Sequence, residues 1–157
     1  MATGNELTHI DGSGKASMVD VSGKPRVKRT ARATCSIHMA PSTIALVRAN
    51  GMAKGDVLAT ARIAGITAGK KTSDLIPLCH NIAIDRVAVD FEVKDDRVVI
   101  ESLAVCTDKT GIEMEALTAA SVAALTIWDM CKAVDKAMRV EGLTLIEKTK
   151  ETIDGKH

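Results

Sequence analysis

Aromatic residues are nearly absent from this sequence, which has one Phe, one Trp and no Tyr among 157 residues. Proteins that bind single-stranded nucleic acid stack the bases on aromatic rings, and here such rings are missing. The formal net charge is only +1, so no excess of positive charge is available to attract nucleic acid or an anionic membrane. We therefore expect neither nucleic acid nor a membrane as a partner.

Long apolar runs and export signals are also missing. No apolar run reaches the roughly 18 residues of a membrane span. The first residues, MATGNELTHIDGSGKASM, are small and polar, which indicates no signal peptide and a cytoplasmic protein. We expect reduced thiols at all four cysteines, none of which belongs to a C-x-x-C motif: Cys35, Cys79, Cys106 and Cys131.

Metal and phosphate motifs are incomplete in this chain. Cys79 and His80 are adjacent, but a zinc site needs further ligands, so a thiol and an imidazole in a pocket wall is the better interpretation. The segment GITAGKKT has three residues between its glycines where a phosphate-binding loop has four, and Lys71 stands where Ser or Thr should bind magnesium. We expect no metal and no cofactor.

What the sequence does have is enough apolar material for one core, because 46% of its residues are hydrophobic. Residues 1–24 are rich in Gly, Ser, Thr and Asp and predict a flexible N-terminal arm. Within this arm, Met18-Val19-Asp20-Val21 is the only apolar patch. Residues 25–157 are expected to form a single domain.

The clearest periodic pattern lies between Asp108 and Met138 and predicts a helix about 40 Å long. Thr110, followed three residues later by Glu113, forms a capping-box pattern at its start. The apolar stripe that should lie on a sheet consists of Ile112, Ala116, Ala119, Ala123, Ile127, Met130 and Val134.

The opposite side of this helix is also apolar, since no residue from Ala116 to Trp128 carries a charge. A helix that is apolar all round is buried all round. A single domain of this size has little material to cover both faces. We therefore expect the back of the helix to meet another subunit.

The remaining elements follow from alternation, turn residues and helix caps. Pro41 and Asp56 are suited to the starts of two helices, and Pro77 excludes a central strand within an apolar loop that suits a pocket wall. The expected elements are a strand over 26–39, helices over 41–50 and 56–70, the loop over 72–81, a hairpin of 84–93 and 97–106, and a last strand over 143–148. This order predicts an α+β fold, with a ferredoxin-like antiparallel four-stranded sheet and helices packed on one face.

Two basic residues allow both a structural and a functional interpretation. Arg29 falls on the buried face of its strand, where it either reaches out to solvent at the strand end or contacts an anion inside a pocket. Lys54 precedes a helix N-terminus, whose partial positive charge disfavours an ammonium, so this residue could serve as an acid or base. A solvated loop lysine is the simpler alternative at that position.

Three stretches hold most of the polar groups that remain: KGDVLATARIAGI, DLIPLCH and KTGIEMEALTAASVAALTIWDMCKAV. Together they resemble the MoaC family, the cyclic pyranopterin monophosphate synthases of molybdenum cofactor biosynthesis, and the resemblance covers nearly the whole chain. It implies a lyase that converts 3',8-cyclo-7,8-dihydroguanosine 5'-triphosphate to cyclic pyranopterin monophosphate and releases diphosphate. It also implies a homohexamer built as a trimer of dimers, and a radical-SAM GTP cyclase that supplies the substrate.

The resemblance also implies roles for individual residues. The family's catalytic residues fall on Asp129, Lys132 and Lys54, groups that suit repeated proton transfers. From spacing alone, the better interpretation of Asp129 with Lys132 is an ordinary ion pair on a helix surface, and that of Glu113 is a capping residue. The substrate contacts fall on Leu78, Cys79, His80, Met114 and Glu115, with Glu113, Lys70 and Arg29 as additions for the guanine-like edge and the triphosphate.

One distance suggests how such a site would be assembled. Glu115 and Asp129 are fourteen residues apart, which is about 21 Å along a helix. Two such helices packed antiparallel about a two-fold axis would bring Glu115 of one chain towards Asp129 of the other and place the site at the dimer interface. The alternative is a non-catalytic module that binds a small anionic ligand, and turnover distinguishes the two.

Overall fold

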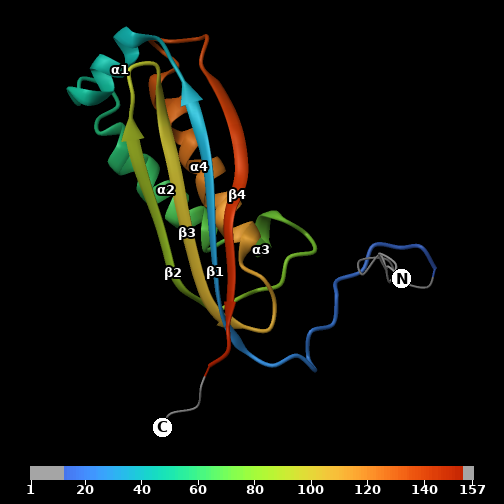
Figure 1. Ribbon diagram of the computed structural model, residues 1–157. Helices are drawn as coiled ribbons and strands as arrows, with labels where there is room; N and C mark the ends of the chain where they lie inside the picture. The colour runs from blue at the N-terminus through green and yellow to red at the C-terminus, as the bar shows by residue number, and fades with distance from the viewer. Residues whose placement is uncertain (1–12, 154–157) are drawn as a thin grey trace, which may run out of the picture.

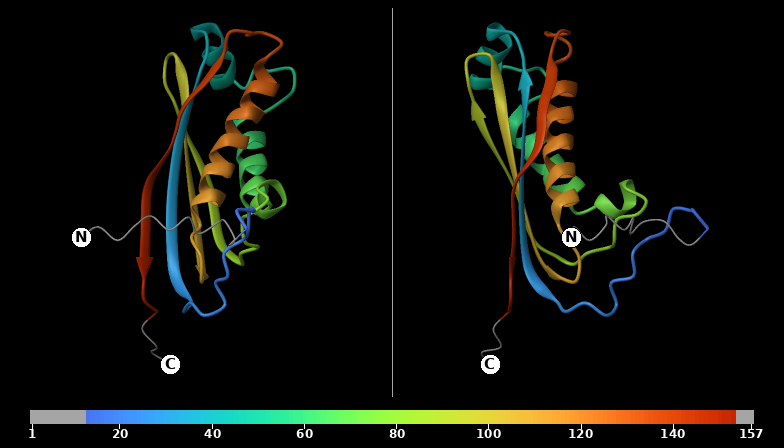
Figure 2. Two further views of the ribbon diagram at one scale, coloured as in Figure 1. Left: turned by 90° about the vertical axis from the view of Figure 1, so that its right-hand side faces the viewer. Right: turned by 45° about the vertical axis from the view of Figure 1, so that its right-hand side comes forward.

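The computed structural model describes residues 13–153, so the first half of the expected N-terminal arm lies outside the described residues. In chain order the elements are β1 Val27–His38, α1 Pro41–Arg48, α2 Val57–Gly69, α3 Thr72–Leu75, β2 Ile84–Val93, β3 Arg97–Asp108, α4 Glu113–Cys131 and β4 Arg139–Glu151. The strands form one antiparallel sheet in the order β2-β3-β1-β4. The long helices α2 and α4 lie side by side on one face of it (Figure 1 and Figure 2). The ferredoxin-like α+β architecture predicted from the sequence is confirmed.

Strand β1 is the centre of the sheet and has the alternating burial that its sequence predicts. It pairs with β3 on one side and with β4 on the other. Ala31, Ala33 and Ile37 are fully buried on the side that α4 covers, whereas Thr30 and Thr34, on the opposite face, are partly exposed. The period of two therefore assigned the correct face to the core.

Helices α2 and α4 approach each other closely because their contact surface is made of very small residues. A Cβ added at Gly65 of α2 would lie 2.8 Å from the Ala119 carbonyl oxygen and 3.2 Å from the Ala123 Cβ. Gly69 approaches α4 in the same way, one turn further along α2. Part of the helix that we expected another subunit to cover is therefore covered by α2 of the same chain, although Leu125 stays exposed.

The capping box predicted at the start of α4 is wrong. The N-cap residue is Ile112, and no side chain caps the helix there. The Glu113 carboxylate pairs instead with Lys148 of β4, which the local pattern could not indicate. Glu113 and Glu115 still occupy the first turn, where the partial positive charge of the helix end favours carboxylates.

The end of α4 also differs, since the helix stops at Cys131 and does not continue to Met138. The Asp135 carboxylate accepts hydrogen bonds from the Ala40 backbone N–H at 2.8 Å and from the Thr43 hydroxyl at 3.1 Å, at the start of α1. This long-range contact overrides the local helix propensity. Val134, predicted as the last member of the buried stripe, is exposed in the turn that follows.

The other elements agree with the sequence patterns except in detail. The Asp56 carboxylate caps α2 by accepting from the Ala59 N–H at 2.9 Å, as predicted. The short helix α3 was not predicted, and β4 is longer than expected because an exposed edge strand with bulges has no clear alternation. All four cysteines are free, and no helix in residues 13–153 has the length and apolar character needed to cross a membrane.

Gly65→Ala should destabilise the protein. The new Cβ would collide with the α4 backbone and lie 3.0 Å from Cγ2 of Val89, so neither neighbour can move away easily. Overpacking of this kind costs about 1–3 kcal/mol, more than the ~1 kcal/mol that alanine gains over glycine within a helix. Urea unfolding measures the loss in the free energy of unfolding.

The control is Gly23→Ala, because a Cβ there would meet nothing within 4 Å. Its free energy of unfolding should change by less than about 0.5 kcal/mol. Wild-type stability in Gly65→Ala would contradict the close packing of the two helices.

Candidate active site

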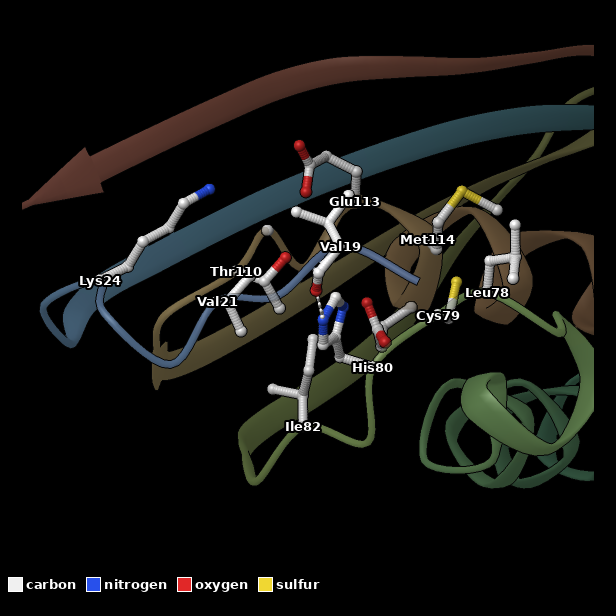
Figure 3. Close-up of a pocket in the computed structure, with 12 residues that line it drawn as sticks. Val19, Val21, Lys24, Leu78, Cys79, His80, Ile82, Thr110, Glu113 and Met114 are labelled. Atoms are coloured by element: carbon white, nitrogen blue, oxygen red, sulfur yellow. Dashed lines mark hydrogen bonds between the residues drawn. The ribbon is translucent and has the colours of Figure 1, made fainter. Parts of the chain in front are cut away.

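A cavity of about 400 Å³ opens beside the N-terminal end of α4 (Figure 3). Four parts of the chain form its wall: the first turn of α4, the loop between β3 and α4, the loop that follows α3, and the described part of the N-terminal arm. It contains six of the eight residues to which the family resemblance gives a substrate contact, namely Leu78, Cys79, His80, Glu113, Met114 and Glu115.

Glu115 is the buried acid of this cavity, with only 3% of its surface exposed. Burial raises the pKa of its carboxyl group to about 6, and the charge of Glu113 adds to the rise, although the backbone N–H of Glu115 opposes it. Burial and the Glu115 charge also raise the pKa of the Cys79 thiol. The cavity therefore has a carboxyl group that changes from a hydrogen-bond donor to an acceptor as it ionises around pH 6, next to an uncharged thiol.

Glu113 reaches from α4 to the edge strand, where Lys148 pairs with its carboxylate. Burial alone would raise the pKa of Glu113, but the hydrogen bond from Lys148 holds it below its usual value. Gly111 makes room for this arrangement, because a Cβ there would overlap the Glu113 carboxylate. The result is a fixed, charged carboxylate at the mouth of the cavity.

The described part of the N-terminal arm lies against the cavity through two hydrogen bonds. The Nε2 atom of His80 is 2.7 Å from the Val19 carbonyl oxygen (Figure 3). The Lys109 ammonium donates to the Ser22 carbonyl oxygen at 2.8 Å. A carbonyl only accepts, so His80 donates from Nε2, and Nδ1 stays available to a ligand. Lys24 adds a positive charge to the lining.

Arg29 lies behind this wall and not in the lining. Its Nε donates to the Asp108 carbonyl oxygen and its Nη2 to the Lys109 carbonyl oxygen, both at 3.1 Å. These bonds fix the loop between β3 and α4, on which Thr110 and Gly111 line the cavity. Arg29 therefore positions the loop, and its contact with an anion stays a prediction.

A second group of residues, the lysine–aspartate cluster, lies at the C-terminal end of α4. The Lys54 ammonium donates to Asp129 Oδ2 at 2.8 Å and to the Asp129 carbonyl oxygen at 3.0 Å, and the Lys132 ammonium donates to Oδ1 at 2.6 Å. The hydrogen bonds from Lys132 and then Lys54 lower the pKa of Asp129 to about 2. Because Lys54 comes from the loop before α2, the cluster is more than a pair along one helix.

The cavity and the lysine–aspartate cluster are at opposite ends of α4, which runs along most of the sheet (Figure 1). Fourteen residues separate Glu115 from Asp129, or about 21 Å. Lys70 belongs to neither group and lines a neighbouring cavity of about 360 Å³. Within one chain, the structure thus assembles each group of assigned residues, but the two groups remain far apart.

Sequence reasoning missed several residues of the cavity, chiefly Lys24, Ile82 and Thr110, and also Lys148, which pairs with Glu113 of the lining. Lys24 lies in a polar arm without a periodic pattern, and Lys148 ends a predicted strand whose place in the sheet the sequence did not give. No group of three or more His, Cys, Asp or Glu within residues 13–153 is arranged to hold a metal ion.

A ferredoxin-like domain with a buried acid in a cavity, and with a carboxylate held between two ammonium groups, has the side chains of an acid–base enzyme. The family model described as the MoaC family matches residues 18–151. The chain is 52% identical over 144 residues to a cyclic pyranopterin monophosphate synthase of Peptoclostridium acidaminophilum, with 92% of each chain covered.

A second relative is the molybdenum cofactor biosynthesis bifunctional protein of Chlorobaculum tepidum, which is also 52% identical over 144 residues. The match covers 92% of this chain but only 46% of that longer protein. This chain belongs to the MoaC family, as its motifs predicted.

Glu115→Gln should remove a pH-dependent cost to stability. The folded pKa of about 6 lies above the ordinary 4.5, so the unfolded chain ionises first as pH rises. The cost is therefore absent below pH 4.5, grows between these values and is complete above pH 6, where it amounts to about 2 kcal/mol. Urea unfolding at pH 4.5 and pH 8, at one protein concentration, measures it.

We compare the free energy of unfolding of Glu115→Gln with that of wild type at each pH. The difference should be about 1–2 kcal/mol more in favour of the variant at pH 8 than at pH 4.5. Glu92→Gln, at an exposed position on β2, reports the effect of losing a surface carboxylate. The same difference between Glu115→Gln and wild type at both pH values would contradict the buried, charged state of Glu115.

Proposed function

We propose that this protein is a cyclic pyranopterin monophosphate synthase, a phosphorus–oxygen lyase of molybdenum cofactor biosynthesis. Its substrate is 3',8-cyclo-7,8-dihydroguanosine 5'-triphosphate, in which the purine imidazole ring is opened and a pyranopterin is built. A sugar hydroxyl then closes onto the innermost phosphorus, and diphosphate leaves. Membership of the MoaC family supports this reaction, and the observation that carries the proposal is the lysine–aspartate cluster.

Ring opening and reclosure are successive proton transfers, so they need amines or acids within hydrogen-bond reach of the reacting atoms. With a pKa of about 2, the Asp129 carboxyl group stays charged at any working pH. It is therefore suited to hold and orient the two lysines, while Lys54 and Lys132 exchange protons with the substrate.

The cavity at the other end of α4 is suited to the guanine-derived ring. Glu113 and Glu115 can accept hydrogen bonds from ring N–H groups, and His80 has Nδ1 available as a further partner. Leu78 and Met114 provide apolar wall, and Cys79 adds an uncharged thiol. Since aromatic rings are almost absent, recognition would depend on these hydrogen bonds and not on stacking.

A complete site requires both groups, and we propose that two subunits supply them. The side chains of Lys54, Asp129 and Lys132 are 47%, 55% and 57% exposed in the single chain, which is open for an acid–base site. Antiparallel packing of two α4 helices about a two-fold axis would place the cluster of one chain over the cavity of the other. The assembly is then a homohexamer built as a trimer of dimers, with the sites at the dimer interfaces.

The substrate must come from an enzyme that forms a carbon–carbon bond within GTP, and a radical-SAM GTP cyclase has that role in the proposed pathway. The bifunctional relative joins a sequence like this one to a further segment of similar length, which supports neighbouring steps in one pathway. We place the protein in the cytoplasm with this partner.

Asp129→Asn should lower kcat by about 10²- to 10⁴-fold, because the lysines lose the anion that orients them. Release of diphosphate from the cyclised nucleotide is the assay, with circular dichroism as a check on folding. Asp90→Asn on β2, exposed and outside both groups, should retain wild-type activity. Native turnover in Asp129→Asn, or no turnover in the wild type, would refute the proposed chemistry.

Mixed oligomers test the shared site. In a dimer of Asp129→Asn with His80→Ala, one of the two sites should receive both intact groups, so random mixing should restore about a quarter of wild-type activity. A mixture of Asp129→Asn with Lys54→Ala should restore none, because both changes affect the same cluster. Failure of the first mixture in oligomers shown to contain both subunits would mean that each chain completes its own site.

A further inference from the structure

A second cavity, of about 360 Å³, lies directly beside the first and is not used by the ring site described above. Ile82 lines both cavities, so they are neighbours at this side chain. Figure 3 shows Ile82 next to His80 at the edge of the first cavity. Apart from Ile82, the second cavity is lined by Ile66 and Lys70 from the α2 segment and by Ile84, Asp85, Arg86 and Val87 of β2.

The charges of the second cavity are unlike those of the first. Lys70 and Arg86 are exposed, and neither forms an ion pair with any residue in 13–153. Asp85 also lines this cavity, and its carboxylate accepts a hydrogen bond from the Thr107 hydroxyl at 3.0 Å. Two cations and one carboxylate leave an excess of one positive charge.

The first cavity has the opposite character. Its lining contains two carboxylates, Glu113 and Glu115, against one lysine, Lys24. Glu113 is charged and Glu115 is almost fully buried, so a phosphate group placed among them would meet repulsion. Donors on a ring suit the first cavity, whereas a polyanion suits the second.

We propose that the second cavity binds the diphosphate end of the nucleotide, with Arg86 and Lys70 as its anion contacts, while the guanine-derived ring occupies the first cavity. This inference rests on the proposed function for the identity of the nucleotide. The planar guanidinium of Arg86 can bind two phosphate oxygens at once, and the Lys70 ammonium adds a point charge. Because the diphosphate is the group that the reaction releases, this cavity would also be the product's exit site.

Inorganic diphosphate is the direct probe, because its binding does not depend on turnover. Calorimetric titration of the full chain should give a dissociation constant about 10-fold higher for Arg86→Gln than for wild type, as expected for the loss of one charge-assisted contact. Arg86→Lys should lie between them. Lys94→Gln removes a positive charge just after the far end of β2 and should bind diphosphate like wild type.

Two nucleotides then locate the contact along the ligand. The dissociation constant of GTP should also be about 10-fold higher for Arg86→Gln than for wild type. GMP has only the innermost phosphate, so it should bind both proteins equally. In turnover assays Arg86→Gln should raise KM by a similar factor and leave kcat within about 2-fold.

The outcomes separate this inference from the proposed function. Equal diphosphate binding by wild type and Arg86→Gln, or an equal loss for GTP and GMP, would overturn the diphosphate site even if turnover is normal. Absence of turnover with the cyclised nucleotide would instead overturn the proposed function, and the diphosphate titration would still decide what the cavity binds.

Discussion

The proposed chemistry depends on one carboxylate, Asp129, held between the ammonium groups of Lys54 and Lys132. These residues come from two places, since Lys54 precedes α2 and the other two lie at the end of α4. The distance between them is therefore set by how closely α2 packs against α4. That packing in turn requires Gly65 and the alanines of α4, because larger side chains would hold the helices apart. A contact between small apolar residues thus fixes the geometry of a polar site.

Helix α4 also sets the distance between the two halves of the site. A straight helix is rigid, so the cavity at its first turn and the lysine–aspartate cluster at its last turn cannot approach each other within one chain. The cluster has an excess of positive charge and the lining of the cavity has an excess of negative charge, so the two are complementary in charge. In the shared site that we propose, oligomerisation would be part of catalysis and not only of stability.

The sequence predicted those features that depend on periodicity and on residue type. Alternation placed β1 and its buried face, and Asp56 was correctly identified as the cap of α2. The capping box at Thr110 and Glu113 was wrong because Lys148, distant in sequence, competes for the carboxylate. The helix end was wrong because Asp135 bonds to the start of α1. Local patterns cannot anticipate such long-range contacts.

The candidate site, like the fold, was predictable only in part. Motif resemblance indicated most residues of the cavity and all of the cluster, but not Lys24, Lys148 or Arg86, which lie outside the three motif stretches. Its place in the strand left Arg29 either reaching out to solvent or meeting an anion, and the structure adds its hydrogen bonds to the carbonyl groups of Asp108 and Lys109. The role of an arginine depends on which acceptors the fold places near it, and its own position in the strand does not reveal them.

The most direct measurement is a crystal structure of the Lys54→Ala oligomer with the cyclised nucleotide bound and unable to react. The shared site predicts that the ring contacts His80 and Glu115 of one subunit while Asp129 and Lys132 of the partner subunit approach it from the other side. A nucleotide held wholly by one chain, with the lysine–aspartate cluster facing bulk solvent, would contradict the central claim.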